Sequence, residues 1–363
     1  MMNENHILLA IHETEGIGWD TMQHIVDAVP DFRAFLERPA TELLAGSKVA
    51  KSKAAKIESV LTNEYIAGKL RFYENRGVVP ISYFDPAYPP LLRHGIEKPP
   101  WVLYAQGDVT LLTRNCAAVV GTRHPTAYGR EVAEWFGAEL AAAGVPVVSG
   151  LARGIDSYAH AGAMRTTGAT IAVLGNGLNV RYPPEHDALQ RAIAKRGLVI
   201  SEYSWDAKPS KLTFPLRNRL IAGIARATIV VEAANRSGSL HTAKCAENAG
   251  RDVFAVPGLI TSPKSVGCYR LIRDGGIMAT SPDDVLSEFG MTKPSPVAAT
   301  TQEQTTPEEA ELLESMGGEA MTIDEMILST NRSFGHLHTV LLSLLVKNRI
   351  RALPGSRYIA RMK

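Results

Sequence analysis

One pattern recurs between residues 116 and 260 and restricts the fold more than any other feature. A short apolar run rich in β-branched residues ends in a small or acidic residue, and a polar loop then opens a helix. Five such runs and one further strand are Cys116–Gly121, Pro146–Gly150, Thr170–Gly175, Gly197–Glu202, Ala227–Ala233 and Asp252–Gly258. Apolar runs alternating with helices are typical of parallel strands covered on both faces. We predict an α/β body whose function lies in the loops at the carboxyl ends of its strands.

Composition narrows the class of protein without naming a function. With 363 residues, 45% of them hydrophobic and 21% charged, the chain suits a globular protein of two or three domains. The net charge is only +2, so any site for a polyanion has to be a local patch. No apolar stretch approaches membrane-spanning length, and three scattered cysteines favour a reducing compartment. We expect a cytoplasmic protein with no membrane attachment.

Two smaller units flank the predicted body, which spans residues 73–290. Residues 1–72 read as short helices, and a Gly-x-Gly turn at residues 16–18 is typical of a helix-hairpin-helix or SAM-like unit, which can bind DNA or pack against protein. Residues 291–306 have the composition of a linker. Residues 307–363 predict three helices and a hairpin, a winged helix. Its third helix carries few basic residues, which leaves DNA binding, protein contact and structural capping open.

The loop after the first run begins with Gly121, Thr122 and Arg123. Glycine lets a ligand approach the backbone, and the helix that follows offers free N–H groups to an anion. The guanidinium of Arg123 adds a planar fork suited to phosphate. Neither the dinucleotide fingerprint G-x-G-x-x-G nor a P-loop is present.

The loop after the second run again combines small residues with an arginine. Its candidate site residues are Ser149, Gly150, Arg153 and Gly154. Asp156 is expected to cap the helix that follows. Asp156 and His160, one turn apart, could instead form an acid–base pair, but capping and core packing are favoured.

The densest basic cluster is Arg217-Asn218-Arg219, which favours an anion site near the end of the fourth run. After the fifth run, Ser237-Gly238-Ser239 predicts a nest of backbone donors at a helix start. Glu202 and Glu232 are the only candidate bases, and holding Arg217 and Arg219 is the role we expect of them. The loops offer no catalytic residue set, no cofactor site and no metal ligands. We therefore predict phosphate binding without turnover by a protein that is not an enzyme.

These motifs, in this order, resemble the DNA-processing protein family DprA, also called Smf. The matching stretches are Gly121–Arg123, Ser149–Asp156, Thr170–Gly175, Phe214–Gly223, Ser237–Leu240 and Gly250–Gly258. The resemblance implies an extended Rossmann-like body that dimerises, needs no nucleotide, and binds single-stranded DNA. It implies protection of incoming DNA and help in loading RecA during natural transformation (competence) and DNA recombination. The implied DNA-binding residues are Gly121, Thr122, Arg123, Ser149, Gly150, Arg153, Gly154, Arg217, Asn218, Arg219, Ser237, Gly238 and Ser239.

Two departures from the family pattern bear on the wall of this site. In the loop after the third run, Tyr182-Pro183 is followed by Pro184, Glu185 and His186, where many relatives have basic or amide residues. Cys268 and Tyr269 follow Gly267, where many relatives have asparagine.

Single strands bind through neutralised phosphates and through bases stacked on aromatic rings. Tyr182, Phe214 and Tyr269 are weaker candidates for such rings, since each could equally belong to the core. The main alternative is a phosphoribohydrolase-type enzyme of a related Rossmann-like family. It would use a Pro-Gly-Gly-x-Gly-Thr loop, whereas residues 237–242 read Ser-Gly-Ser-Leu-His-Thr. A nicotinamide dehydrogenase is a weaker alternative, because the dinucleotide fingerprint is absent. The third class of function is a scaffold protein without affinity for DNA.

Overall fold

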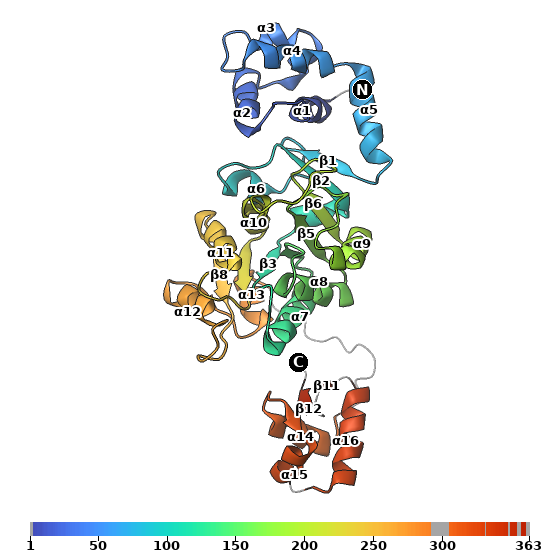
Figure 1. The fold of residues 1–363 in the computed structure, drawn as a ribbon, viewed down its shortest axis with the longest axis vertical. Helices are drawn as coiled ribbons and strands as arrows, with labels where there is room; N and C mark the ends of the chain where they lie inside the picture. The colour runs from blue at the N-terminus through green and yellow to red at the C-terminus, as the bar shows by residue number, and fades with distance from the viewer. Residues whose placement is uncertain (1–2, 292–304, 331, 348, 354–356, 361–363) are drawn as a thin grey trace. The chain divides into compact units, whose positions relative to one another are not determined.

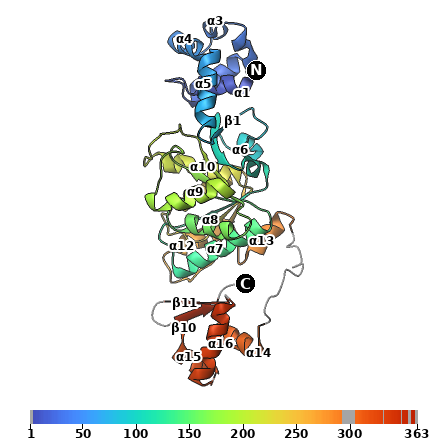
Figure 2. The ribbon, with the colours of Figure 1, turned by 90° about the vertical axis from the view of Figure 1, so that its right-hand side faces the viewer.

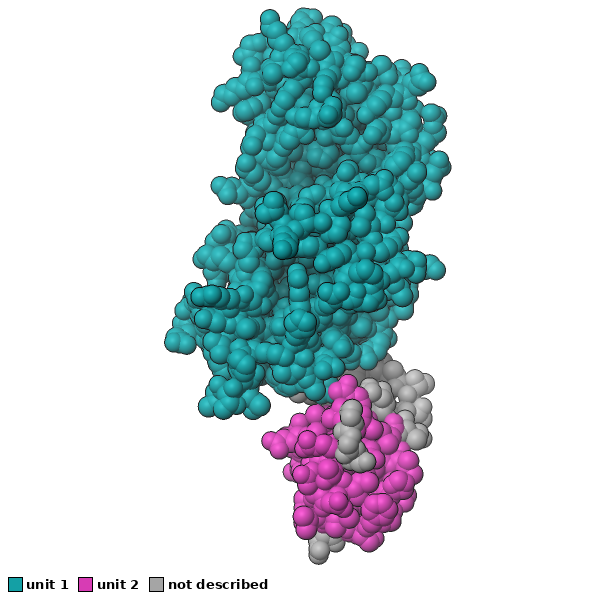
Figure 3. Space-filling view, in the orientation of Figure 1, with its two compact units in different colours: residues 1–292 teal, residues 293–363 magenta. Residues whose placement is uncertain are grey.

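A computed structural model describes residues 3–291, 305–330, 332–347, 349–353 and 357–360. The chain divides into two compact units, residues 1–292 and residues 293–363 (Figure 3). Each unit is described separately below.

The first unit is built on a nine-stranded sheet with the order β1-β2-β6-β5-β4-β3-β7-β8-β9 (Figure 1). Six strands correspond to the predicted runs: β3 (Ala117–Val120), β4 (Val147–Ser149), β5 (Thr170–Leu174), β6 (Leu198–Ser201), β7 (Ala227–Val230) and β8 (Asp252–Ala255). The pairings among these six strands are all parallel, as predicted. The parallel edge strand β9 (Ile277–Met278) and the antiparallel pair β1 (Val79–Ser82) and β2 (Val102–Gly107) extend the sheet.

Helices cover both faces of this sheet (Figure 2). They are α6 (Pro90–Gly95), α7 (Ala127–Ala142), α8 (Ile155–Arg165), α9 (Asp187–Arg196), α10 (Thr213–Ile224), α11 (Gly238–Asn248), α12 (Val266–Arg273) and α13 (Pro282–Glu288), with the short 3-10 turns η2 (Val109–Thr113) and η3 (Pro184–His186). The parallel sheet, its helical layers and its crossovers confirm the predicted α/β, Rossmann-like class.

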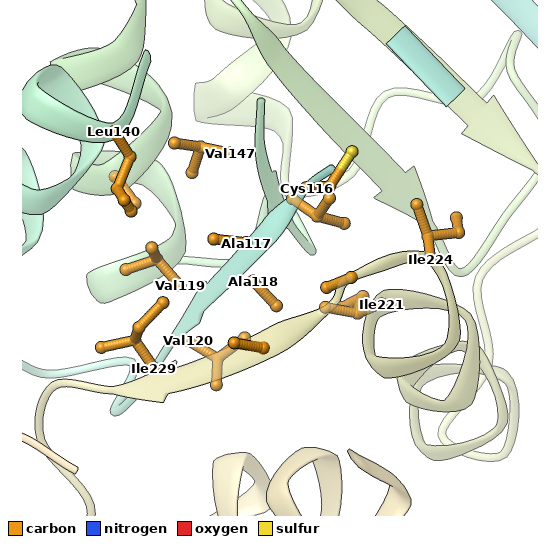
Figure 4. Packing of buried hydrophobic residues seen from close by; sticks show 14 of the residues in the cluster. Cys116, Ala117, Ala118, Val119, Val120, Leu140, Val147, Ile221, Ile224 and Ile229 are labelled. Carbon is orange, nitrogen blue, oxygen red and sulfur yellow. The ribbon is translucent and has the colours of Figure 1, made fainter. Parts of the chain in front are cut away.

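The central strand β3 shows why the sheet needs both layers. All four of its residues are buried, and Figure 4 shows them among Leu140 of α7 and Ile221 and Ile224 of α10. A strand buried on both faces reads as a continuous apolar run rather than an alternating one. Val132, Phe136 and Leu140 of α7 are buried, whereas Tyr128 at the start of the helix is exposed.

The N-terminal segment is helical, as predicted. It comprises α1 (Glu4–His12), α2 (Trp19–Ala28), η1 (Phe32–Leu36), α3 (Ala40–Leu43), α4 (Lys51–Val60) and α5 (Asn63–Glu74). Its apolar core is continuous with Tyr104 of β2, Leu174 of β5 and Val199 of β6. The segment therefore packs on one end of the sheet, and a domain boundary at residue 72 stays a proposal.

The second unit contains α14 (Pro307–Met316), β10 (Met321–Thr322), α15 (Ile323–Thr330), α16 (Phe334–Val346), β11 (Ile350–Leu353) and β12 (Arg357–Ala360). The strands form a small antiparallel sheet, and the three helices enclose their own apolar core. A capping box opens each of the first two helices, with Thr306 and Glu309 at α14 and Thr322 and Glu325 at α15. This is the predicted winged helix. The hairpin turn at residues 354–356 and nearly all of the predicted linker lie outside the described residues.

Candidate functional site

Loops at the carboxyl ends of the strands border one open cleft of about 550 Å³. The loop after β3 contributes Gly121 and Arg123, and the start of α11 contributes Ser237 to Ser239. The start of α10 contributes Phe214, Pro215, Arg217 and Asn218. We call this hollow the Arg123 cleft. The prediction that these loops meet at one edge of the sheet is confirmed, because parallel strands end on the same side.

Gly121 lets the first loop pass close to the helix after β4. A Cβ atom at this position would lie 2.5 Å from Cγ1 of Ile155. The neighbouring Thr122 donates its backbone N–H to the carbonyl of Glu232 over 2.7 Å. The Glu232 carboxylate accepts from the backbone N–H of Thr126 at 2.9 Å and from its hydroxyl at 2.6 Å. Glu202 and Glu232 were expected to hold Arg217 and Arg219. For Glu232 that expectation is wrong, because its carboxylate fixes the loop that carries Arg123.

Arg123 presents its guanidinium to the cleft. The side chain is exposed, and it makes no ion pair within the described part of the chain. Its Cζ atom lies 5.9 Å from the ring centroid of Phe214, within range of a cation–π contact. An exposed guanidinium with no internal carboxylate keeps its charge and donors for an external anion.

Arg217 has a different environment from the one the sequence suggested. It is only 4% exposed and donates to the carbonyls of Gly150, over 2.7 Å, and Val173. Burial lowers the pKa of its guanidinium to about 10, an effect that nearby Asp156 opposes. Arg217 therefore ties together the ends of β4 and β5 at the floor of the cleft. This geometry favours a structural role, and its predicted role as a phosphate ligand stays a prediction.

Asp156 does not cap α8, because its carboxylate accepts from the backbone N–H groups of Gly150 at 3.1 Å and Ala152 at 3.3 Å. It shapes the loop that precedes the helix. His160 is fully buried, and its Nδ1 lies 2.7 Å from the hydroxyl of Thr170. Desolvation lowers the pKa of His160 to about 3, so the ring is neutral. No hydrogen bond joins these two described side chains, in agreement with packing rather than acid–base roles.

The remaining arginines are already paired. Arg219 forms an ion pair with Glu202, as expected, and donates to the carbonyl of Lys98 at 2.8 Å. Arg153 forms an exposed ion pair with Glu185, one of the residues that depart from the family pattern. Arg219 is absent from the lining of the Arg123 cleft, whereas Arg153 borders a small pit beside it. Only a ligand that displaces Glu185 would free the Arg153 charge.

The small polar side chains among the candidate site residues differ in whether they reach the cleft. Ser149 is buried and donates its hydroxyl to the carbonyl of Val119 at 2.7 Å, so its side chain does not reach the cleft. Ser237 caps α11, and its hydroxyl lies 2.8 Å from that of Ser239. Asn218 directs its Nδ2 toward the carbonyl of Gly238 at 3.5 Å. The start of α11 thus presents these hydroxyls and the exposed backbone N–H of Gly238 to the cleft, because Ser237 already accepts from the N–H groups of Ser239 and Leu240.

Two of the three aromatic candidates border the cleft. The rings of Tyr182 and Phe214 lie 5.2 Å apart at 30°, and Tyr182 is 37% exposed. Tyr269 lies elsewhere and donates its hydroxyl to the carbonyl of Gly258. Lys211 also lines the cleft. Lys211 lies close to the basic cluster in the sequence, and this proximity could have identified it as a candidate site residue.

Gly154 is needed where two loops cross. Its φ is +80°, and a Cβ atom there would lie 2.7 Å from Cα of Arg123. We expect Gly154→Ala to lower the free energy of unfolding by more than about 1 kcal/mol, because the backbone conformation and the close approach both exclude a side chain. Urea unfolding measures this, with Gly144→Ala as a control at positive φ but in open space. Equal losses of stability for both variants would exclude the loop crossing as the cause.

The chemistry available in the cleft is that of anion binding. Asp156 is the only acid among the described lining residues, and the loop amides already occupy its carboxylate. No group of three His, Cys, Asp or Glu side chains suited to a metal ion occurs in the part of the chain that the structure describes. Arg123, the hydroxyls and the exposed N–H of Gly238 suit phosphate, and the two aromatic rings suit a flat base.

A family model described as DNA recombination-mediator protein A matches residues 80–290, which include every candidate site residue. The chain belongs to this family, DprA. A second model, the DprA winged helix domain, matches residues 296–356. Protein Smf of Escherichia coli is 38% identical over 276 residues, which is 74% of each chain. The DNA processing protein DprA of Streptococcus pneumoniae is 45% identical over 212 residues, 57% of this chain and 73% of that protein.

Solved structures of DprA proteins agree with this membership. The S. pneumoniae DprA structure superposes with a TM-score of 0.68 at 33% identity, covering 79% of this chain and 99% of that one. Helicobacter pylori DprA, solved for its single-stranded DNA binding mode, superposes with a TM-score of 0.52 at 30% identity, covering 58% and 95%. The DprA fold and the family's connection to DNA processing are therefore established for this chain. Among the described residues, no helix is both long and apolar enough to cross a membrane.

Proposed function

We propose that this DprA protein binds single-stranded DNA in the Arg123 cleft and changes no covalent bond there. The observation that carries the proposal is an exposed arginine without an internal ion pair in the described chain, placed beside two aromatic rings and a helix start. Phosphates would contact Arg123 and the α11 amides, and bases would stack on Tyr182 and Phe214. Because stacking needs unpaired bases, single strands should bind more tightly than duplex.

Of the residues implied by the resemblance, we assign direct contact to Gly121, Thr122, Arg123, Asn218, Ser237, Gly238 and Ser239. Ser149, Gly150, Gly154 and Arg217 would act by shaping the loops. Arg153 and Arg219 would contribute only if their carboxylate partners were displaced. The division follows from burial and ion pairing in the first unit.

We further propose a cytoplasmic homodimer that protects incoming DNA and helps load RecA, in keeping with a family of recombination mediators. RecA ATP hydrolysis on DNA coated with single-strand binding protein tests the loading role. The protein should shorten the lag, and Arg123→Ala should restore it. An unchanged lag with wild-type protein would contradict RecA loading. Light scattering tests the homodimer, for which it should give twice the mass of one chain.

The alternative, a phosphoribohydrolase, needs a carboxylate free to act. Glu202 and Glu232 are the residues that could serve. Glu202 is held in an ion pair with Arg219, and both oxygens of Glu232 accept hydrogen bonds from Thr126. Incubation with AMP followed by chromatography for adenine decides this alternative. We expect none to be released, and release above a protein-free control would contradict the non-catalytic proposal.

The winged helix is expected to be dispensable for strand binding. Phe334, His338 and Leu342 are exposed on α16, and no Lys or Arg is exposed among the described residues of that helix. Chain 1–292 should therefore bind a single strand with an affinity within about threefold of the full chain, a difference below about 1 kcal/mol. Anisotropy titration checks this, and a loss of all binding would place the site in the second unit.

A further inference from the structure

A second hollow of about 380 Å³ lies in the first unit, between the N-terminal helices and the sheet. Its walls include Phe72 of α5 and Trp205 of the segment that follows β6. We call it the Trp205 cleft. None of its lining residues belongs to the Arg123 cleft.

The floor of the Trp205 cleft is polar but internally satisfied. The Glu13 carboxylate is 8% exposed and accepts from the hydroxyls of Tyr73 and Tyr104, the latter at 2.7 Å. Lys69 forms an ion pair with the same carboxylate at 2.8 Å. Lys69 is the only Lys or Arg among the described lining residues, so no cation is left there for a phosphate.

The walls are aromatic and held in place. The rings of Phe72 and Trp205 meet edge to face, with centroids 6.5 Å apart. Arg76 covers one face of Phe72 at 3.7 Å from the ring centroid. The backbone N–H of Asn179 donates to the carbonyl of Trp205 at 3.1 Å, and its side chain donates to Asp206 at 2.6 Å. A fixed aromatic wall above a neutralised floor suits a flat, uncharged group such as a nucleobase.

The two clefts are joined by one segment of chain. The residues between β6 and α10 run from Ser204 and Trp205 in the second cleft to Lys211 in the first. Lys208 lies between them. Both lysines are exposed and have no ion pair within the described residues. Unpaired lysines along a short path are the expected contacts for a sugar-phosphate backbone.

We propose that the single strand leaving the Arg123 cleft follows Lys211 and Lys208 and places a base against Trp205. The inference rests on the proposed function and extends its footprint to the N-terminal helices. A free nucleotide fits less well, because Lys69, the only Lys or Arg among the described lining residues, is already paired with Glu13. The Trp205 cleft would therefore add affinity only to strands long enough to reach it.

The test compares a short oligonucleotide of roughly 6 nucleotides with a long one of roughly 24, using the full chain. Trp205→Ala should weaken binding of the long strand on the order of tenfold, as expected when one base can no longer stack, and leave the short strand unchanged. Trp205→Phe keeps an aromatic face and should retain most of that affinity. Lys208→Ala should reduce the salt slope by about 0.7 for the long strand alone.

Fluorescence gives a second readout if Trp205→Ala fails to fold. The long strand should quench wild-type tryptophan emission more than that of Trp205→Phe, and the short strand should quench both alike. The proposal that a base binds in the Trp205 cleft would be overturned if the long strand quenched both proteins equally. It would also be overturned if Trp205→Ala weakened binding of both strand lengths equally. Arg123→Ala should weaken both lengths. Wild-type affinity of that variant would overturn the proposed function instead.

Discussion

Arg217→Ala is expected to lower the free energy of unfolding by about 3–5 kcal/mol, the usual cost of removing one partner from a buried charged network. The substitution leaves the carbonyls of Gly150 and Val173 without their guanidinium donor and leaves Asp156 without its nearby positive charge. Urea unfolding followed by circular dichroism measures the destabilisation.

Arg130→Ala is the matched control, because Arg130 is exposed on α7 and lines neither cleft. Its effect on stability should stay within about 0.5 kcal/mol. If Arg217→Ala is as stable as this control but binds DNA poorly, Arg217 is a phosphate ligand after all.

Arg123→Ala should have the opposite profile. Stability should change by less than about 0.5 kcal/mol, since the side chain is exposed and unpaired within the described residues. Affinity for single strands should fall on the order of tenfold, as expected when a charged hydrogen bond is removed, and equally for all base sequences. The slope of log K against log salt should decrease by about 0.7 for each phosphate that the variant no longer neutralises.

The readout is fluorescence anisotropy with labelled oligonucleotides at several salt concentrations. Arg123→Lys should keep most of the slope, because the charge remains although the planar fork is absent. Arg130→Ala should bind like wild type. A wild-type slope for Arg123→Ala would exclude Arg123 as a phosphate ligand.

The sequence was sufficient to predict the sheet and the edge that carries the site. Apolar runs such as residues 116–121 report burial on both faces directly, and the direction of parallel strands brings their loops together. That reasoning needs no knowledge of side-chain contacts. It placed Arg123, Phe214 and Ser237 near one another, and the structure does so as well.

The roles of the other charged residues could not be read from type and position alone. Arg217 and Arg219 are two positions apart on α10, so they point in different directions, one beneath the cleft and one toward Glu202. Which acid meets which arginine depends on how close the loops pass. Gly150 permits that approach, since a Cβ atom there would lie 2.5 Å from the Arg217 guanidinium.

The Trp205 cleft could not be predicted for a related reason. It joins Glu13, Phe72 and Trp205, which are far apart in the chain and belong to no shared motif. Only the packing of the N-terminal helices on the β2 end of the sheet brings them together.

Direct comparison of single- and double-stranded oligonucleotides of one sequence tests strand capture by the Arg123 cleft most simply. Wild-type protein should bind the single strand more tightly and return it uncut, and Arg123→Ala should weaken binding of the single strand on the order of tenfold. Tighter binding of duplex, or wild-type affinity of the variant for the single strand, would contradict a cleft that holds unpaired bases beside an arginine without an internal ion pair.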